Sequence, residues 1–163
     1  MPNIAKTEKS QVMEKTHEAT ALLRADHKHV SDLFAKYEEQ QSPSQKRALV
    51  ALLCTELKIH VQIEEEIFYP AVKQALKDKE MIPEGLVEHA AISDLIRQVE
   101  NIAPDGEMFD AKIKVMSEYV KHHVKEEQQE MFPKAKASTL DMNVLGARMV
   151  LRKKELLTKM TGH

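Results

Sequence analysis

The chain has 163 residues, a length that usually forms one domain with a buried core. Aromatic residues make up only 4% of the sequence, with four Gly and nine Met, which is typical of an all-helical protein. The net charge of −2 argues against a dedicated nucleic-acid binder. No window approaches the ~20 apolar residues of a membrane span, and none resembles a signal peptide. We therefore expect a soluble, cytoplasmic protein.

The first 16 residues are polar and of mixed charge, and a loose N-terminal arm is expected there. Further along, apolar residues recur every three or four positions, which predicts amphipathic helices over 19–40, 44–78, 84–101, 108–131 and 140–160. Ser44 is the expected N-cap of the second helix, and Pro70 is expected to kink or weaken its last turns. No run alternates apolar and polar residues between turns, so no strand is expected.

Short connections between the first four predicted helices favour an all-α fold, an up-down-up-down antiparallel four-helix bundle. The fifth predicted helix is expected to be an additional C-terminal helix that packs on this bundle. The expected division of the chain is an arm over residues 1–16, the bundle over 17–135 and the C-terminal helix over 136–163.

The four bundle helices contain an internal repeat. An Asp-His pair that ends at His27 is matched by a Glu-His pair that ends at His89, 62 residues later. The motif His-x-x-x-Glu that begins at His60 recurs 63 residues later, at His123, and an aromatic-Pro pair follows both copies. The matched spacing indicates a duplicated helical hairpin, whose two copies we expect to face each other about a pseudo-twofold axis.

Six side chains of this repeat are predicted to point into the interior of the bundle. Residues four apart lie on one face of a helix, so the histidine and the glutamate of each His-x-x-x-Glu motif share a face. The histidines of the first and third helices lie on apolar stripes of their own. The expected set is His27, His60, Glu64, His89, His123 and Glu127.

Two buried carboxylates need compensating positive charge, because burying an unpaired charge is costly. No Lys or Arg shares these faces at the height of the histidines, so metal ions are the expected source. Four imidazoles and two carboxylates suit two first-row ions with bridging carboxylates, and iron is favoured over manganese and zinc. His27 would pair with His60 on one ion, and His89 with His123 on the other. A structural bundle without metal is the alternative.

Several other sites are excluded by their motifs. The single cysteine rules out an internal disulfide and a cysteine zinc site, and a zinc-peptidase His-Glu-x-x-His is missing. The Glu-x-x-His spacing of ferritin-like proteins occurs only from Glu14 to His17, in the predicted arm. The remaining histidines lie off the ligand faces or near the chain ends and are expected to be surface groups: His17, His29, His122 and His163.

Taken together, these motifs resemble those of the hemerythrin-like, HHE cation-binding proteins over residues 19–135. The resemblance implies a four-helix bundle that encloses a non-haem di-iron centre. It implies one iron on the two histidines of the first hairpin and the second iron on the two histidines of the second hairpin. It also implies that Glu64 and Glu127 bridge the irons, together with an oxo or hydroxo group.

One position departs from the oxygen-carrying hemerythrins, which have a further histidine one turn after the ligand of the third helix. That position is Ser93 here, which disfavours reversible oxygen carriage and favours an open coordination position on each iron. Glu56 and Tyr119 each lie one turn before a ligand histidine, and Tyr69 lies beside Pro70. Together with Ser93, these three side chains are the candidates to support the centre, either by orienting a ligand or by filling an open position.

We therefore expect a di-iron protein that binds or reacts with O2, peroxide or NO in oxidative or nitrosative stress and iron handling. A catalase-like, peroxidase-like or NO-handling redox activity is one form of this hypothesis, and no catalytic residue is assigned. The alternative is a reversible O2- or NO-binding, iron-storage or sensing protein without turnover. The expected partners are these small molecules, with no nucleic acid and no membrane, and we expect a monomer or weak homodimer.

Overall fold

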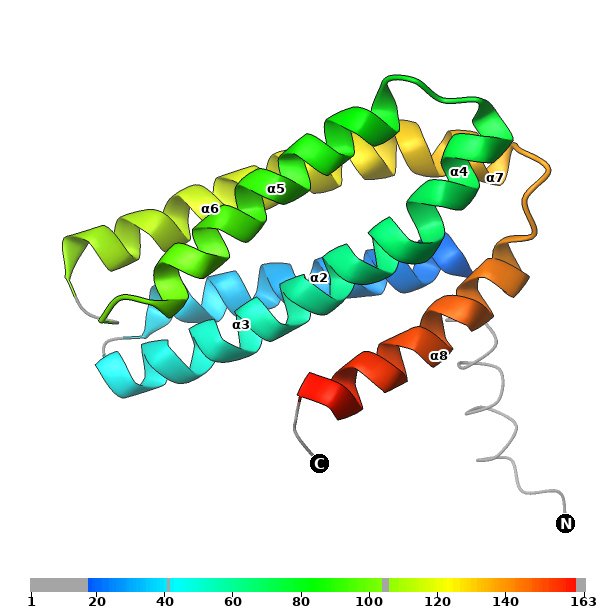
Figure 1. The fold of residues 1–163 in the computed structure, drawn as a ribbon. Coiled ribbons are helices and arrows are strands. Elements are labelled where there is room, and N and C mark those ends of the chain that lie inside the picture. The colour runs from blue at the N-terminus through cyan, green and yellow to red at the C-terminus, as the bar shows by residue number, and fades with distance from the viewer. Residues whose placement is uncertain (1–17, 41, 104–105, 161–163) are drawn as a thin grey trace, which may run out of the picture.

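The structure, a computed structural model, describes residues 18–40, 42–103 and 106–160. The predicted arm over residues 1–16, His17 and His163 lie outside the described residues. Every regular element in the described part of the chain is a helix (Figure 1). The elements are α2 (Ala19–Glu39), α3 (Pro43–Ile63), η1 (Glu64–Phe68), α4 (Tyr69–Leu76), α5 (Met81–Glu100), α6 (Glu107–Glu126), η2 (Glu127–Met131), α7 (Phe132–Lys136) and α8 (Met142–Met160).

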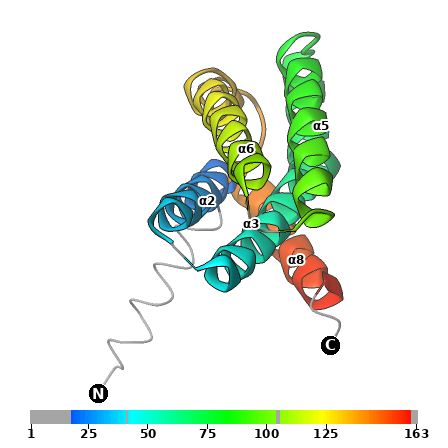
Figure 2. The ribbon, with the colours of Figure 1, turned by 90° about the vertical axis from the view of Figure 1, so that its left-hand side faces the viewer.

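The long helices form an antiparallel bundle, which confirms the predicted all-α fold. Helix α2 packs against α3, and α5 packs against α6, so the bundle consists of two helical hairpins. We call α2 to α4 the first hairpin and α5 to α7 the second hairpin. Helix α8 lies outside the four-helix bundle, beside α3 in Figure 2, and contacts α2, α3 and η1. No helix among the described residues is long and apolar enough to cross a membrane.

Pro70 and Pro133 do not end their helices. Proline lacks an N–H, and in a regular helix its ring collides with the carbonyl group four residues before it. Each helix accommodates its proline through one wider, five-residue turn, η1 or η2, in which Tyr69 N–H, for example, donates to the carbonyl of Glu64 five residues earlier. The kink predicted at Pro70 is therefore a local widening, and in both hairpins the widened turn begins at a predicted carboxylate ligand.

Helix α5 begins at Met81, earlier than its predicted start at residue 84. The Asp78 carboxylate accepts hydrogen bonds from the backbone N–H groups of Met81 at 3.1 Å and Ile82 at 2.7 Å. Pro83 lies in the first turn, where a missing N–H removes no bond of the helix. With this earlier start, Gly85 lies in the second turn of the helix, against the ring of Tyr69.

The starts of α3 and α8 follow the same local rules. Pro43 occupies the first position of α3 and Ser42 its N-cap, so Ser44, the predicted cap, lies inside the first turn. At the start of α8, the Asp141 carboxylate accepts hydrogen bonds from two backbone N–H groups of the first turn. Capping by short polar side chains satisfies groups that have no partner inside a helix.

Two apolar clusters fill the bundle. The cluster next to α8 includes Leu23, Ile63 and Met149, all with no exposed surface. The second cluster occupies the other end of the bundle and includes Leu53 and Met116. Along each long helix, the predicted ligand histidines stand between the residues of the two clusters. The fold therefore encloses one polar layer between two apolar ones.

Candidate metal centre

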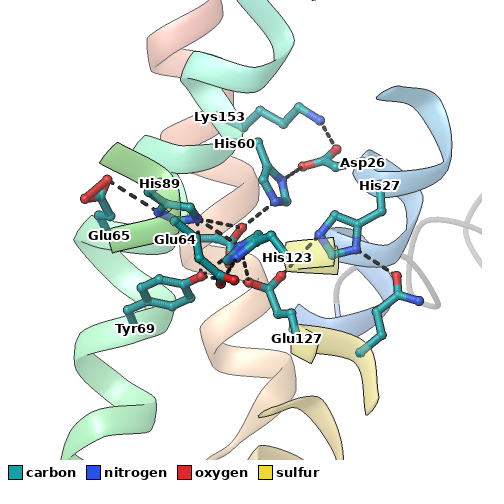
Figure 3. A network of polar contacts seen from close by, with 12 residues as sticks. Asp26, His27, His60, Glu64, Glu65, Tyr69, His89, His123, Glu127 and Lys153 are labelled. Carbon is teal, nitrogen blue, oxygen red and sulfur yellow. Dashed lines mark hydrogen bonds and ion pairs between the residues drawn. The ribbon is translucent and has the colours of Figure 1, made fainter. Parts of the chain in front are cut away.

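Six buried polar side chains meet in this layer, and Figure 3 shows them pointing toward one another from both hairpins. Each is at most 7% exposed. They are the six residues predicted from the repeat: His27 on α2, His60 on α3, Glu64 on η1, His89 on α5, His123 on α6 and Glu127 on η2. The repeat in the sequence has thus brought chemically matched side chains from the two hairpins to one place.

The six side chains form two overlapping groups, and in each group the ligand atoms lie within 4.8 Å of one another. One group contains the two histidines of the first hairpin, and the other contains the two histidines of the second hairpin. Glu64 and Glu127 belong to both groups. The polar layer can therefore hold two cations that share both carboxylates.

The two oxygens of Glu127 face different hairpins. Its Oε1 lies 3.1 Å from His27 Nε2, and its Oε2 lies 3.0 Å from His123 Nε2. The Glu64 carboxylate is placed similarly, because its Oε1 contacts His60 Nε2 and lies 3.8 Å from His89 Nε2. A carboxylate that faces a histidine from each hairpin has the placement that a bridging ligand requires.

Several of the buried polar atoms have no hydrogen-bond partner, which tests whether a metal fits. These atoms include Nε2 of His27, Nε2 of His60, both oxygens of Glu64 and Oε1 of Glu127. A buried polar group without a partner costs free energy, and two carboxylates in one apolar layer cost more. Imidazole nitrogens and carboxylate oxygens are ligands for first-row cations, so bound ions would satisfy these atoms.

The outer ring nitrogens of three histidines are held by hydrogen bonds. His60 Nδ1 donates to Asp26 at 3.1 Å, and His123 Nδ1 donates to Glu88 at 2.8 Å. His27 Nδ1 donates to the side-chain oxygen of Gln128 at 2.7 Å. With the proton held on Nδ1, the Nε2 lone pair of each ring faces the centre, ready to bind a cation.

These outer partners follow the repeat, although sequence reasoning missed their role. Asp26 and Glu88 each precede a ligand histidine and bond to a ligand histidine of the neighbouring helix in the same hairpin. Gln128 and Glu65 each follow a ligand glutamate, and Glu65 lies 3.6 Å from the outer nitrogen of His89. The signal present in the sequence was a polar residue beside each ligand, repeated in both copies.

The electrostatics of the layer favour added positive charge. Burial and the neighbouring Glu127 raise the pKa of Glu64, because two carboxylates resist sharing one apolar site. Burial alone would lower the pKa of His60, but the charge of Glu64 raises it well above the usual value. His123 behaves alike: its hydrogen bond to Glu127 outweighs burial and raises its pKa to about 9. Protons therefore partly supply the charge that cations would bring.

Tyr69 also reaches the centre. Its hydroxyl donates to Glu127 Oε2 at 2.8 Å and lies 3.2 Å from the Nε2 atoms of His89 and His123. The wide turn η1 explains this position. In this turn the residue that lies one turn after Glu64 on the same face of the helix is Tyr69, five positions later, and not the residue four positions later. Burial and the charge of Glu64 raise the pKa of Tyr69 strongly, so the phenol is neutral.

Three other candidates do not join the six side chains. Tyr119 is 46% exposed on α6. Glu56 lies near the surface, with its Oε1 3.8 Å from the exposed His29. Ser93 is partly exposed on α5, one turn after His89, and belongs to neither group of ligand atoms. Of the four residues predicted to support the centre, only Tyr69 contacts the ligand side chains.

Comparisons with known proteins agree with this geometry. The sequence profile of the Hemerythrin HHE cation binding domain matches residues 11–135. The solved structure of an HHE cation-binding domain-containing protein from Mycobacterium kansasii superposes with a TM-score of 0.74 and 24% identity, covering 85% of this chain and 86% of that one, which shows the shared fold.

A curated relative from Nostoc, described as a DNA nickase, is 24% identical over 111 residues. The match covers 68% of this chain but only 31% of that protein, so the chain spans about a third of its relative's length. The profile match covers most of the chain and includes all six buried histidines and glutamates. The chain belongs to the hemerythrin HHE cation-binding domain family.

Proposed function

We propose that the six buried side chains hold two iron ions and that the protein reacts with O2, peroxide or NO in oxidative or nitrosative stress. The observation that carries this proposal is the sharing of Glu64 and Glu127 by two histidine pairs. Two redox-active ions held this closely would supply electrons to a small oxygen or nitrogen species. Manganese and zinc fit the same donors, but zinc does not change oxidation state, and iron is favoured over manganese for this mixture of imidazoles and carboxylates.

Two features of the chain support small ligands as partners. The apolar clusters exclude bulk water from the layer on both sides. A pocket of about 20 Å³, which is room for roughly one water-sized molecule, reaches the buried His123 and Glu127 from between α5 and η2. A diatomic or a peroxide matches this space, whereas the nucleic acid named for the much longer Nostoc relative does not.

Tyr69 supports a reaction with turnover. Its neutral phenol holds a proton 2.8 Å from Glu127 and beside two ligand histidines. Reduction of peroxide requires protons at the developing oxygen anions, and a buried hydrogen-bond donor can deliver or hold one. Ser93 adds no imidazole to the second hairpin, which leaves coordination positions for a substrate.

The test is metal analysis and an optical spectrum of protein purified without a histidine tag. Two irons per chain with charge-transfer bands are expected. The protein is then mixed with peroxide, with O2 after reduction, and with NO. Oxygen evolution with turnover supports an enzyme, while a stable and reversible adduct supports a binding or sensing protein. A protein that purifies and refolds without any bound metal would refute both.

A further inference from the structure

The two hairpins differ on the surface that lies just outside the centre. In the first hairpin, the repeat positions there are apolar and lie in the cluster covered by α8: Leu22, Leu23, Ile59, Ile63 and Ile67. In the second hairpin, the equivalent positions carry Glu84, Gly85, His122, Glu126 and Glu130. Helix α8 packs mainly against the first hairpin. The second hairpin therefore presents its polar residues at these positions to solvent, namely Glu84, His122, Glu126 and Glu130, while Gly85 is buried against Tyr69.

Three of the residues on this surface form a compact group of metal-ligand type. His122 Nε2 lies 3.1 Å from Glu126 Oε1 and 3.4 Å from Glu88 Oε2, and one ligand atom from each residue lies within 4.8 Å of the others. His122 is exposed, with 65% of its side chain accessible, so its nitrogen is available to an ion from solvent. One imidazole and two carboxylates suit a first-row divalent cation. We call Glu88, His122 and Glu126 the outer group.

The outer group stands over the pocket that reaches the buried centre. Glu88 and Glu126 line this pocket together with the buried His123 and Glu127. Glu127 is 1% exposed, so the pocket ends at a buried carboxylate. The Oε2 of this carboxylate faces His123, and its Oε1 has no hydrogen-bond partner, so a bound cation would stabilise it. Glu88 belongs to both regions, since its Oε1 accepts from His123 and its Oε2 faces His122.

The charge along the pocket favours cations throughout. Glu84 and Glu130 add two exposed carboxylates at its rim. Among the described residues that line the pocket, none is Lys or Arg. A concave surface lined with one sign of charge raises the local concentration of counter-ions and the rate at which they bind.

We propose that Glu88, His122 and Glu126 form a peripheral site that captures a divalent cation and passes it through this pocket to the buried centre. Capture by the outer group requires only the residues on the surface, whereas the transfer rests on the proposed metal centre. The equivalent positions of the first hairpin offer no such route, because isoleucines replace His122 and Glu126 and α8 covers them. A second pocket does reach the buried His27, but Lys121 and Lys125 line it and their positive charge repels cations. Ions for both histidine pairs therefore arrive from the side of the second hairpin.

The test of transfer is the rate of loading. Metal-free protein is mixed without oxygen with limiting Co²⁺, whose visible absorption reports binding at the centre. The double variant His122→Ala, Glu126→Gln is expected to load about tenfold more slowly or worse, because the outer charge and imidazole are gone. Its final cobalt content and spectrum should match the wild type. Equal loading rates would overturn the transfer role.

The matched control removes a His-Glu pair that lies on the first hairpin. The exposed His29 and the partly exposed Glu56 lie 3.8 Å apart, away from the pocket. The variant His29→Ala, Glu56→Gln should load at the wild-type rate, and an equal slowing in both double variants would overturn the proposal. A wild-type protein that takes up no Co²⁺ at its centre would instead refute the proposed function.

Capture by the outer group is tested separately, on protein whose centre is already filled with Zn²⁺. Substoichiometric Mn²⁺ should broaden the amide NMR signals of residues 122–126 first, because a paramagnetic ion broadens its nearest nuclei. The His122→Ala, Glu126→Gln variant should lose this broadening. Broadening that begins elsewhere, or that persists in the variant, would overturn capture by the outer group even if the centre loads normally.

Discussion

The two hairpins bring the same kinds of side chain to the centre but differ in what surrounds it. Ile59 and Ile63 of the first hairpin are sealed under α8, whereas His122 and Glu126 occupy the equivalent positions of the second hairpin and reach solvent. The inner residues are repeated and the outer ones are not. Duplication thus explains the paired histidines and glutamates. Helix α8 explains why the centre is covered on the side of the first hairpin and open on the side of the second.

The aromatic residues show the same asymmetry. Tyr69 and Phe132 are equivalent in the repeat, and each stacks on a histidine of the opposite hairpin, with ring centres 5.1 Å and 5.9 Å apart. A side chain at Gly85 would meet the Tyr69 hydroxyl at 3.0 Å, and the equivalent residue of the first hairpin is Leu23. The glycine therefore provides room for a hydroxyl that only one side of the centre has.

The largest effect is expected where the hairpins share a residue. Glu127 contacts histidines of both hairpins, so Glu127→Ala should reduce iron from two per chain to nearly none. His27→Ala removes a ligand of one group only and should lose mainly one iron. Iron analysis and the optical spectrum distinguish these outcomes. Two irons with an unchanged spectrum in Glu127→Ala would show that this carboxylate does not bridge.

The sequence was sufficient for the six residues at the centre, because a repeat and a four-residue spacing are properties of local chain geometry. It was insufficient to distinguish Tyr69 from Tyr119, because Tyr119 was a candidate from its helical spacing and Tyr69 only from its place beside Pro70. The wide turn η1 rotates Tyr69 inward, while regular helix carries Tyr119 outward to 46% exposure. A wide turn of this kind cannot be predicted reliably from the local sequence. One sign of it was present in both copies of the repeat, since a proline follows six residues after Glu64 and six residues after Glu127.

The role of α8 was also beyond the sequence. Its amphipathic pattern predicted a helix over residues 140–160, and the structure has one over Met142–Met160. Which hairpin it would cover depended on contacts between distant residues, such as Met149 against the cluster of Ile59 and Ile63. The sequence did contain one signal. The first hairpin has isoleucines where the second has His122 and Glu126, and the more apolar hairpin is the one that α8 covers.

The next effect concerns stability without metal. Ligands that bind only the folded state stabilise it, by about 4 kcal/mol at a thousandfold excess over Kd, so removing metal should lower Tm by about 8–16 °C. The decrease in Tm on removing metal should grow with pH. Despite burial, contacts with Glu127 raise the pKa of His123 from 6.5 to about 9, so folded protein holds a proton that the unfolded chain releases.

This contribution of His123 is complete below pH 6.5 and is lost as pH rises through about 9. The raised pKa values of Glu64 and His60 act in the same direction. Calorimetry of metal-free protein should therefore show Tm falling between pH 6.5 and 9. Metal-loaded protein should show a flatter profile, because cations replace the protons. Identical profiles with and without metal would favour a purely structural bundle.

A smaller effect is expected from a substitution in the second hairpin alone. Ser93→His introduces an imidazole one turn after His89, on the same helix, α5. We expect slower reaction with peroxide and longer retention of O2 in the reduced protein, because a third imidazole would occupy a coordination position. Ser93→Ala is the control and should behave as the wild type. A wild-type protein that binds and releases O2 over many cycles would contradict the prediction.

Tyr69→Phe would give both hairpins a phenylalanine at this position of the repeat, because the equivalent residue is Phe132. The loss of one buried hydrogen bond should cost about 1 kcal/mol of stability, and both irons should remain bound. If the phenol supplies a proton, the peroxide rate should fall and its solvent isotope effect should change. Gly85→Ala, which crowds the same hydroxyl, should give a similar rate. An unchanged rate in both variants would remove Tyr69 from the reaction.

The smallest effect is expected from the contact that joins α8 to the closed side. Lys153 Nζ lies 2.7 Å from Asp26, whose other oxygen accepts from His60 at 3.1 Å. Burial raises the pKa of Asp26, but His60 and Lys153 outweigh burial and hold it below its usual value of 3.8. Lys153→Met should therefore cost about 0.5–1 kcal/mol at neutral pH, the range of a partly exposed ion pair.

The pH dependence of this loss identifies its cause. A depressed carboxyl pKa stabilises the folded state above its ordinary value, and that contribution disappears as pH falls through the lower folded value. The difference between wild type and Lys153→Met should thus shrink below pH 3.8. Lys154→Met removes the same charge from the exposed face of α8 and should cost less at every pH. Equal losses of stability in both variants would mean that Lys153 acts only through the net charge of α8. The apolar contacts of α8 would then be what holds this helix on the first hairpin.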